Sequence, residues 1–183
     1  MPDSTKQIKT HSVSISGIFI SIGTGLSLPL AHFSSTSNPV FGILGRLEFA
    51  STAIFPFVIG GEVDYFSYTG NDNYMTQNLL TTYQTKIFSY GLSAEFTFAR
   101  LIKSHYTIPY LCMDIKSNKI TRDISGISGS VPLPVSLKES RVSFGAGFGF
   151  TLFVLDFFVK YNYMKELSDF GVYAKIKFPL IKF

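Results

Sequence analysis

The chain has 183 residues, of which 46% are hydrophobic and only 15% are charged, with 19 Phe, 10 Tyr and no Trp. The formal net charge of +4 is modest and the basic residues are scattered, so the composition argues against a nucleic-acid-binding surface. A single cysteine, Cys112, excludes an internal disulfide and a multi-cysteine metal site, and no run approaches the ~20 apolar residues of a membrane-spanning helix.

The first ten residues are polar, and we expect a flexible leader over residues 1–10 followed by a single domain over residues 11–183. No signal peptide is visible after Met1, so a barrel in a membrane would be a mature form with an added Met. The first strand is predicted from about Ser12 to Leu30. Its alternation is ambiguous before Gly17, which indicates a bulge there.

Four further segments alternate with a period of two, which is the pattern of a strand. They are residues 40–50, 54–68, 83–99 and 106–116. In the first three, one face is aromatic or aliphatic, and the other carries mostly Gly, Ser and charged residues. In the fourth, the apolar face opposes Tyr110, Cys112 and Asp114. The stretch 117–140 is rich in Gly, Ser and Pro. It fits a surface loop, either irregular throughout or with an extended hairpin tip.

The clearest alternation is RVSFGAGFGFTL, from Arg141 to Leu152. One face holds Val, Phe, Ala and Leu, whereas the other is mostly glycine with Arg141 at one end. A glycine face weakens a strand that faces water, but it suits the narrow interior of a closed barrel whose apolar face is turned to lipid. A buried sandwich strand is the alternative. Two strands follow, one ending at Tyr163 and one over 170–183, where the phase slips at Pro179.

Eight strands in this order predict an all-β fold, namely an up-and-down antiparallel eight-stranded transmembrane β-barrel. Short connections alternate with generally longer ones at 31–39, 69–82 and 117–140, as in barrels with short periplasmic turns and longer extracellular loops. Closure also removes the exposed edges of such an apolar sheet. Aromatic residues near strand ends suit interface girdles. They are Tyr65, Tyr68, Tyr83, Tyr90, Tyr161 and Tyr163.

The last residues, KIKFPLIKF, form an apolar alternating strand with a terminal Phe, which resembles the C-terminal signature of bacterial outer-membrane barrels. The stretches GLSLPLAHFS, IPYLCMDI and FGAGFGFTLFVLDFFVKYNY are similar to segments of small eight-stranded barrels of the OmpA-barrel and OmpX type, including the "outer membrane protein beta-barrel" group. The resemblance covers the chain from about Val13. It implies the outer membrane of a Gram-negative bacterium, contact with outer-membrane lipid and lipopolysaccharide, and functions that range from anchors and adhesins to occasional lipid-modifying enzymes.

The charged residues on the inward faces have both signs in similar number, so they can pair inside a lumen where a lone charge is costly. They are Arg46, Glu48, Glu62, Asp64, Glu95, Asp114, Arg141, Asp156, Lys160, Lys175 and Lys177. From these we predict a lumen charge network of Arg46, Glu48, Glu62, Asp64, Glu95, Asp114, Arg141, Lys160 and Lys175. A pore lining, or a catalytic acid pair of Glu62 and Asp64, is the alternative. Eight strands, however, leave an interior just wide enough for side chains.

Catalytic chemistry is sparse in the sequence. None of His11, His32 and His105 lies at a suitable spacing from a nucleophile, although a Ser/His or Asp/His site can converge in space. GAGFG lacks the third glycine and the helix of a dinucleotide site, and residues 71–73 lack the remaining ligands of a calcium loop. We therefore expect no catalytic residue, metal or cofactor.

Three functions remain. The first is a non-enzymatic outer-membrane barrel that acts as a structural or interaction component, with loops 69–82 and 117–140 as its contact surface for other envelope proteins. The second is a narrow channel for small or apolar solutes. The third is a lipid-acting or proteolytic barrel enzyme. A soluble lipocalin-like carrier would need the apolar faces inward, and the glycine faces argue against that.

Overall fold

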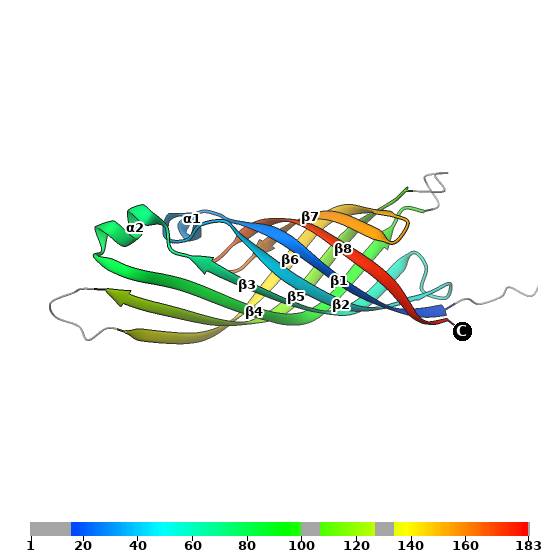
Figure 1. Cartoon of the computed structure of the whole chain (residues 1–183). Coiled ribbons are helices and arrows are strands. Elements are labelled where there is room, and N and C mark those ends of the chain that lie inside the picture. The colour runs from blue at the N-terminus through cyan, green and yellow to red at the C-terminus, as the bar shows by residue number, and fades with distance from the viewer. Residues whose placement is uncertain (1–15, 100–106, 127–133, 183) are drawn as a thin grey trace, which may run out of the picture.

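Eight antiparallel strands close into a barrel in which each strand pairs with its neighbours in the chain (Figure 1). The strands are β1 (Ser16–Pro29), β2 (Val40–Ser51), β3 (Phe57–Thr69), β4 (Leu80–Thr97), β5 (Thr107–Gly126), β6 (Val135–Leu152), β7 (Leu155–Tyr163) and β8 (Asp169–Lys182). This computed structural model describes residues 16–99, 107–126 and 134–182, so the predicted leader lies outside the described residues. The predicted up-and-down eight-stranded barrel is confirmed.

The ring closes between β1 and β8, where the ladder contains one irregularity. Ile18 pairs with Ile181, whereas the next residue of β1, Phe19, pairs with Pro179, so Leu180 is the extra residue of a bulge in β8. A proline cannot donate to the ladder, which explains why the irregularity lies beside it. The phase slip predicted at Pro179 is therefore confirmed. The bulge predicted before Gly17 falls almost wholly outside the described residues.

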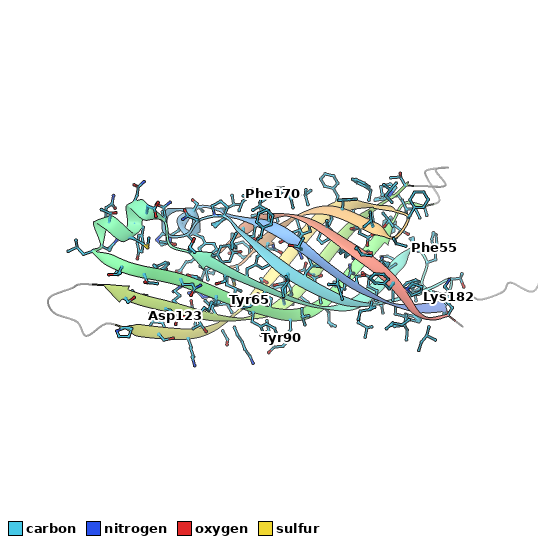
Figure 2. All side chains as sticks on the ribbon, viewed as in Figure 1. Phe55, Tyr65, Tyr90, Asp123, Phe170 and Lys182 are labelled. Carbon is cyan, nitrogen blue, oxygen red and sulfur yellow. The ribbon has the colours of Figure 1, made fainter. Side chains whose placement is uncertain are left out.

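The apolar face of each strand forms the outside of the barrel. In β6, Val142 is 56% exposed, Phe144 is 55% exposed and Phe148 is 64% exposed, and comparable residues stand on all the other strands. Figure 2 shows side chains projecting from the outer wall along the whole barrel. So large an apolar surface is stable in lipid but not in water, as in membrane-spanning barrels.

The two ends of the barrel differ in their connections. Short turns at 52–56 and 153–154 lie at the end that carries the strand termini Ser16 and Lys182 (Figure 1). The opposite end carries two short helices, α1 (His32–Thr36) and α2 (Asp72–Gln77). Within the described residues, neither helix is long and apolar enough to cross a membrane. The predicted alternation of short and longer connections is thus found.

Three strands run on beyond the rest of the barrel at the long-loop end (Figure 1). We call residues 80–87, 118–126 and 135–143, which belong to β4, β5 and β6, the projecting sheet; within it, residues 84–87 still pair with the end of β3. The prediction of an irregular loop over 117–140 is wrong, because much of this stretch is strand; the alternative of an extended hairpin agrees with the described residues, in which β5 and β6 pair from Ser117 to Ile124. The outward positions here are polar, as at Lys119 and Thr121, so the apolar row that marks a lipid-facing strand is missing and the composition resembles that of a loop.

Candidate functional site: the closed lumen and the projecting sheet

An ion-pair cluster fills the half of the lumen nearest the short-turn end of the barrel, where Ser16 and Lys182 lie. Lys175 Nζ lies 2.6 Å from Glu48 Oε1 and 3.0 Å from Glu95 Oε1. The same ammonium lies 3.3 Å from Asp156 Oδ2, and Lys177 Nζ lies 2.7 Å from Glu48 Oε2. The three carboxylates approach one another closely enough to hold a metal ion. The ammonium of Lys175, however, already contacts all three and supplies the compensating charge that buried carboxylates require.

A second cluster follows toward the long-loop end. Lys116 Nζ lies 2.6 Å from Asp64 Oδ2 and 3.5 Å from Glu62 Oε1. Lys160 Nζ lies 2.9 Å from Glu62 Oε1 and 2.8 Å from Asp114 Oδ2. These side chains are only 3–7% exposed. Each carboxylate of the alternative catalytic pair, Glu62 and Asp64, is therefore engaged by an ammonium.

The structure brings together every member of the predicted network except Arg141. Those inside the lumen are Arg46, Glu48, Glu62, Asp64, Glu95, Asp114, Lys160 and Lys175. Arg46 joins the first cluster by donating to Glu95 Oε1. Lys116 was missed at the last position of the strand predicted over 106–116, although it lies two residues after Asp114 and so shares its inward parity.

The glycines of the inward faces make room for these long side chains. Gly23 pairs with Lys175 across the β1–β8 ladder, and Gly145 pairs with Asp114 across the β5–β6 ladder. A Cβ atom built on Gly145 would overlap the Asp114 carboxylate, and one on Gly23 would overlap the Cβ of Lys175. The glycine face and the charged network are therefore complementary in shape, since long side chains in so narrow a lumen must lie across the neighbouring strand.

Apolar side chains close the long-loop end of the lumen. Phe33 of α1 is fully buried, and its ring centroid lies 4.8 Å from that of Tyr68. Met164 and Leu167, from the β7–β8 connection, are each 4% exposed. Tyr68 and Tyr83 are thus buried, and their prediction as interface residues is wrong. Below this closure, two lumenal cavities measure only about 10 and 20 Å³, each sufficient for about one water molecule.

Arg141 lies at the rim, where it joins the projecting sheet to the β7–β8 connection. Its Nη2 atom is 2.8 Å from Glu139 Oε2, and Glu139 Oε1 is in turn 2.9 Å from Arg122 Nη2. Arg141 Nη1 lies 3.1 Å from Glu166 Oε2 and donates to the carbonyl oxygen of Lys165. The hydrogen bond that Arg141 Nη1 donates to the Glu166 carboxylate lowers the pKa of that carboxyl. The prediction that Arg141 belongs to the lumen network is corrected, because the strand carries it beyond the lumen.

The two edges of the projecting sheet are unlike. On the β4 side, the Gly70 amide donates to the carbonyl oxygen of Tyr83, and the ring centroid of Tyr74 in α2 lies 5.2 Å from that of Tyr83. On the β6 side, pairing with β7 reaches only as far as Phe144, which pairs with Tyr163. Within the described part of the chain, β6 is therefore bonded on one side only before that residue.

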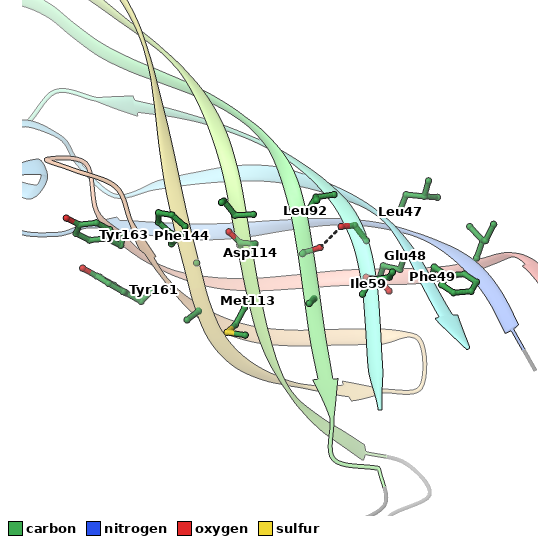
Figure 3. A pocket seen from close by; sticks show the side chains of 17 residues that line it. Leu47, Glu48, Phe49, Ile59, Leu92, Met113, Asp114, Phe144, Tyr161 and Tyr163 are labelled. Atoms are coloured by element: carbon green, nitrogen blue, oxygen red, sulfur yellow. Dashed lines mark hydrogen bonds between the residues drawn. The ribbon is translucent and has the colours of Figure 1, made fainter. Parts of the chain in front are cut away.

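A large depression is lined by outward-facing side chains of the barrel wall, and Figure 3 shows the residues around it. It measures about 1000 Å³, and its lining includes Leu47, Leu92, Met113 and Phe144. These residues belong to the apolar exterior, so acyl chains would cover the depression in a bilayer. His32 is exposed on α1, and no ion pair joins it to an acid among the described residues; His11 and His105 lie outside them.

A closed ring of eight antiparallel strands, apolar outside and charged inside, has no open strand edge within the membrane, and this arrangement decides the fold. The chain has the fold of a small outer-membrane β-barrel. Its charged interior and apolar exterior place it in the bacterial outer membrane, where such barrels reside.

The alignment with one solved structure, Neisserial surface protein A, supports this fold. Neisserial surface protein A shares 18% identity with this barrel and aligns with a TM-score of 0.64 over 89% of this chain and 97% of that chain. Ail of Yersinia pestis shares 14% identity and aligns with a TM-score of 0.49 over 90% of this chain and 98% of that chain. The N-terminal β-barrel domain of Pseudomonas aeruginosa OprF shares 13% identity and aligns with a TM-score of 0.46 over 87% of this chain and 97% of that chain. No protein-family model matches the sequence, and no curated protein matches it either.

Proposed function

We propose that this outer-membrane barrel is a non-enzymatic structural and interaction component that presents its projecting sheet and long-loop end as a contact surface. The observation that carries the proposal is the contrast between a lumen with room for single water molecules and a three-stranded sheet that extends past the apolar belt. A protein whose interior is filled acts through its surface, and the projecting sheet carries polar surface past the apolar belt.

The filled lumen speaks against a channel for small solutes. The first cluster and the apolar closure at Phe33 stand in series along the lumen, and a solute would have to displace both. The engaged carboxylates also speak against an enzyme. An acid that donates or accepts a proton must be reachable by a substrate, whereas Glu62 and Asp64 are buried against lysines.

Lipid and other envelope molecules are the expected partners of the outer wall and the projecting sheet. Along β6 the outward residues change from Val142 in the apolar belt to Lys138 beyond it, and along β4 they change from Phe88 to Lys86. Lysines at this level would meet the anionic groups of outer-leaflet lipids, including lipopolysaccharide.

Two measurements test the proposal. Purified barrel in a planar bilayer should give no steady conductance, and large, steady channels would instead establish the channel function. In intact cells, a photo-reactive amino acid at Leu137, which is 50% exposed on the projecting sheet, should form adducts with other envelope proteins. The matched position Phe148, in the apolar belt, should form adducts mainly with lipid. Protein adducts at Phe148 alone would contradict the proposed contact surface.

A further inference from the structure

The open edge of β6 suits one class of partner. We infer that this edge, from Val135 to Ser143, binds an extended segment of another protein as an added strand that carries acidic side chains on the outer side of the sheet. The inference rests on the proposed interaction function and names the kind of partner that the projecting sheet takes.

The backbone of this segment has the groups that strand addition needs. Every residue from Val135 to Ser143 pairs with β5, from Ile124 to Lys116, while pairing with β7 begins only at Phe144. In an antiparallel sheet, alternate residues of an edge strand direct their N–H and C=O groups away from the neighbour. Because the segment from Val135 to Arg141 lies beyond the apolar belt, which begins at Val142, those groups are presented there to the aqueous exterior, where a partner strand can reach them.

The opposite edge of the projecting sheet does not offer the same site. There the Gly70 amide already bonds to the Tyr83 carbonyl oxygen, and α2 packs beside β4 through Tyr74. The chain therefore covers one edge with its own connection and leaves the other uncovered within the described residues.

A second copy in the same membrane fits the edge less well. Two copies inserted with the same orientation have β6 strands that run the same way relative to the membrane, so their open edges could pair only in parallel, the arrangement that is slightly less stable per residue. An extended segment of a different protein has no such restriction and can approach in either direction.

The side chains along the edge specify the chemistry of that segment. On the outer side, Lys138 is exposed between Ser136 and Ser140, and it makes no ion pair among the described residues. On the inner side, Leu137 is 50% exposed, whereas Glu139 is already paired with Arg141. A complementary strand places an acidic residue beside Lys138 and an apolar residue beside Leu137, so it alternates between acidic and apolar positions.

The test uses a synthetic peptide of alternating Glu and Val, as long as the open edge, with the full barrel in lipid nanodiscs. Binding is followed by fluorescence anisotropy of the labelled peptide. Three matched peptides isolate the cause of binding. The first is the Glu/Val peptide, the second carries N-methyl groups at alternate backbone nitrogens, and the third has Lys in place of Glu. N-methylation removes the main-chain donors and keeps the side chains, so it should weaken binding at least tenfold.

Charge reversal on the barrel provides the second comparison. Lys138→Glu should weaken the Glu/Val peptide about fivefold and strengthen the Lys/Val peptide by a similar factor, as expected for a cross-strand charge pair. Lys182→Glu makes the same charge change at the other end of the barrel, where Lys182 is exposed, and should alter neither affinity.

Three results would overturn the inference. Equal affinity for the N-methylated peptide would show that main-chain pairing does not carry the binding. Failure of all peptides to bind, with adducts at Leu137 still formed in cells, would reject strand addition and leave the interaction function in place. Loss of both peptide binding and adducts would reject the two together.

Discussion

The two halves of β6 are one continuous strand with opposite properties. From Phe144 to Leu152 the strand is bonded on both sides, with glycine facing the lumen and aromatic residues facing outward. From Val135 to Ser143 it is bonded on one side among the described residues, and polar side chains stand on both of its faces. The surroundings explain the change, because hydrocarbon demands full pairing and an apolar exterior, whereas water demands neither. The four substitutions below compare the membrane-embedded barrel with the projecting sheet.

Loss of a lumenal ammonium should have the largest effect. Lys175→Met would leave the carboxylates of Glu48, Glu95 and Asp156 with only their remaining cations, and we expect a loss of about 3–5 kcal/mol in unfolding free energy. Urea unfolding in lipid vesicles measures it. Lys138→Met, on the exposed face of the projecting sheet, should change the same quantity by less than about 0.5 kcal/mol. Similar effects at both positions would mean that the lumen network is well solvated.

A charge on the outer wall should have the next largest effect. Phe148→Arg places a guanidinium at lipid depth and should cost about 2–4 kcal/mol if the residue lies near the midplane. Ser140→Arg makes the same addition on the outward face of the projecting sheet and should cost little. The comparison is made by equilibrium unfolding in vesicles. Equal costs would contradict the boundary drawn between these residues.

A methyl group in the lumen should have an intermediate effect. A Cβ atom on Gly147 would overlap the backbone of β7 at Val159 and Lys160, so Gly147→Ala should cost about 1–3 kcal/mol through overpacking. Ser140→Ala, on the exposed face, serves as the control and should be nearly neutral. If Gly147→Ala unfolds at the same urea concentration as the unmodified protein, the lumen is less closely packed than the side-chain arrangement implies.

Removing the rim arginine should have the smallest effect. Arg141→Ala breaks partly exposed pairs with Glu139 and Glu166, and such pairs contribute about 0.2–1 kcal/mol. Because Arg141 lies outside the lumen network, planar-bilayer recordings should show the variant to be as closed as the unmodified barrel. Steady conductance from this variant alone would mean that the β7–β8 connection, held by Arg141, closes the lumen.

The sequence predicts the membrane-embedded barrel better than it predicts the projecting sheet. Where lipid surrounds the strand, outward residues must be apolar, so the alternation in residues 144–152 indicates both the strand and its orientation. Beyond the membrane nothing enforces alternation, and residues 117–126 and 135–140 resembled a loop although they form strands. Parity placed most inward charges correctly, but it carries no information about height along the barrel. Arg141 therefore has the inward parity of the network and lies above it.

Backbone hydrogen exchange along β6 tests most directly whether one strand serves both environments. With the barrel in nanodiscs, we expect slow exchange at every amide from Phe144 to Leu152, because both sides of that segment are paired. From Val135 to Ser143, every second amide should exchange rapidly, because its donor points to the open edge. Uniform protection across both segments would contradict the open edge, and rapid exchange throughout Phe144 to Leu152 would contradict the closed barrel.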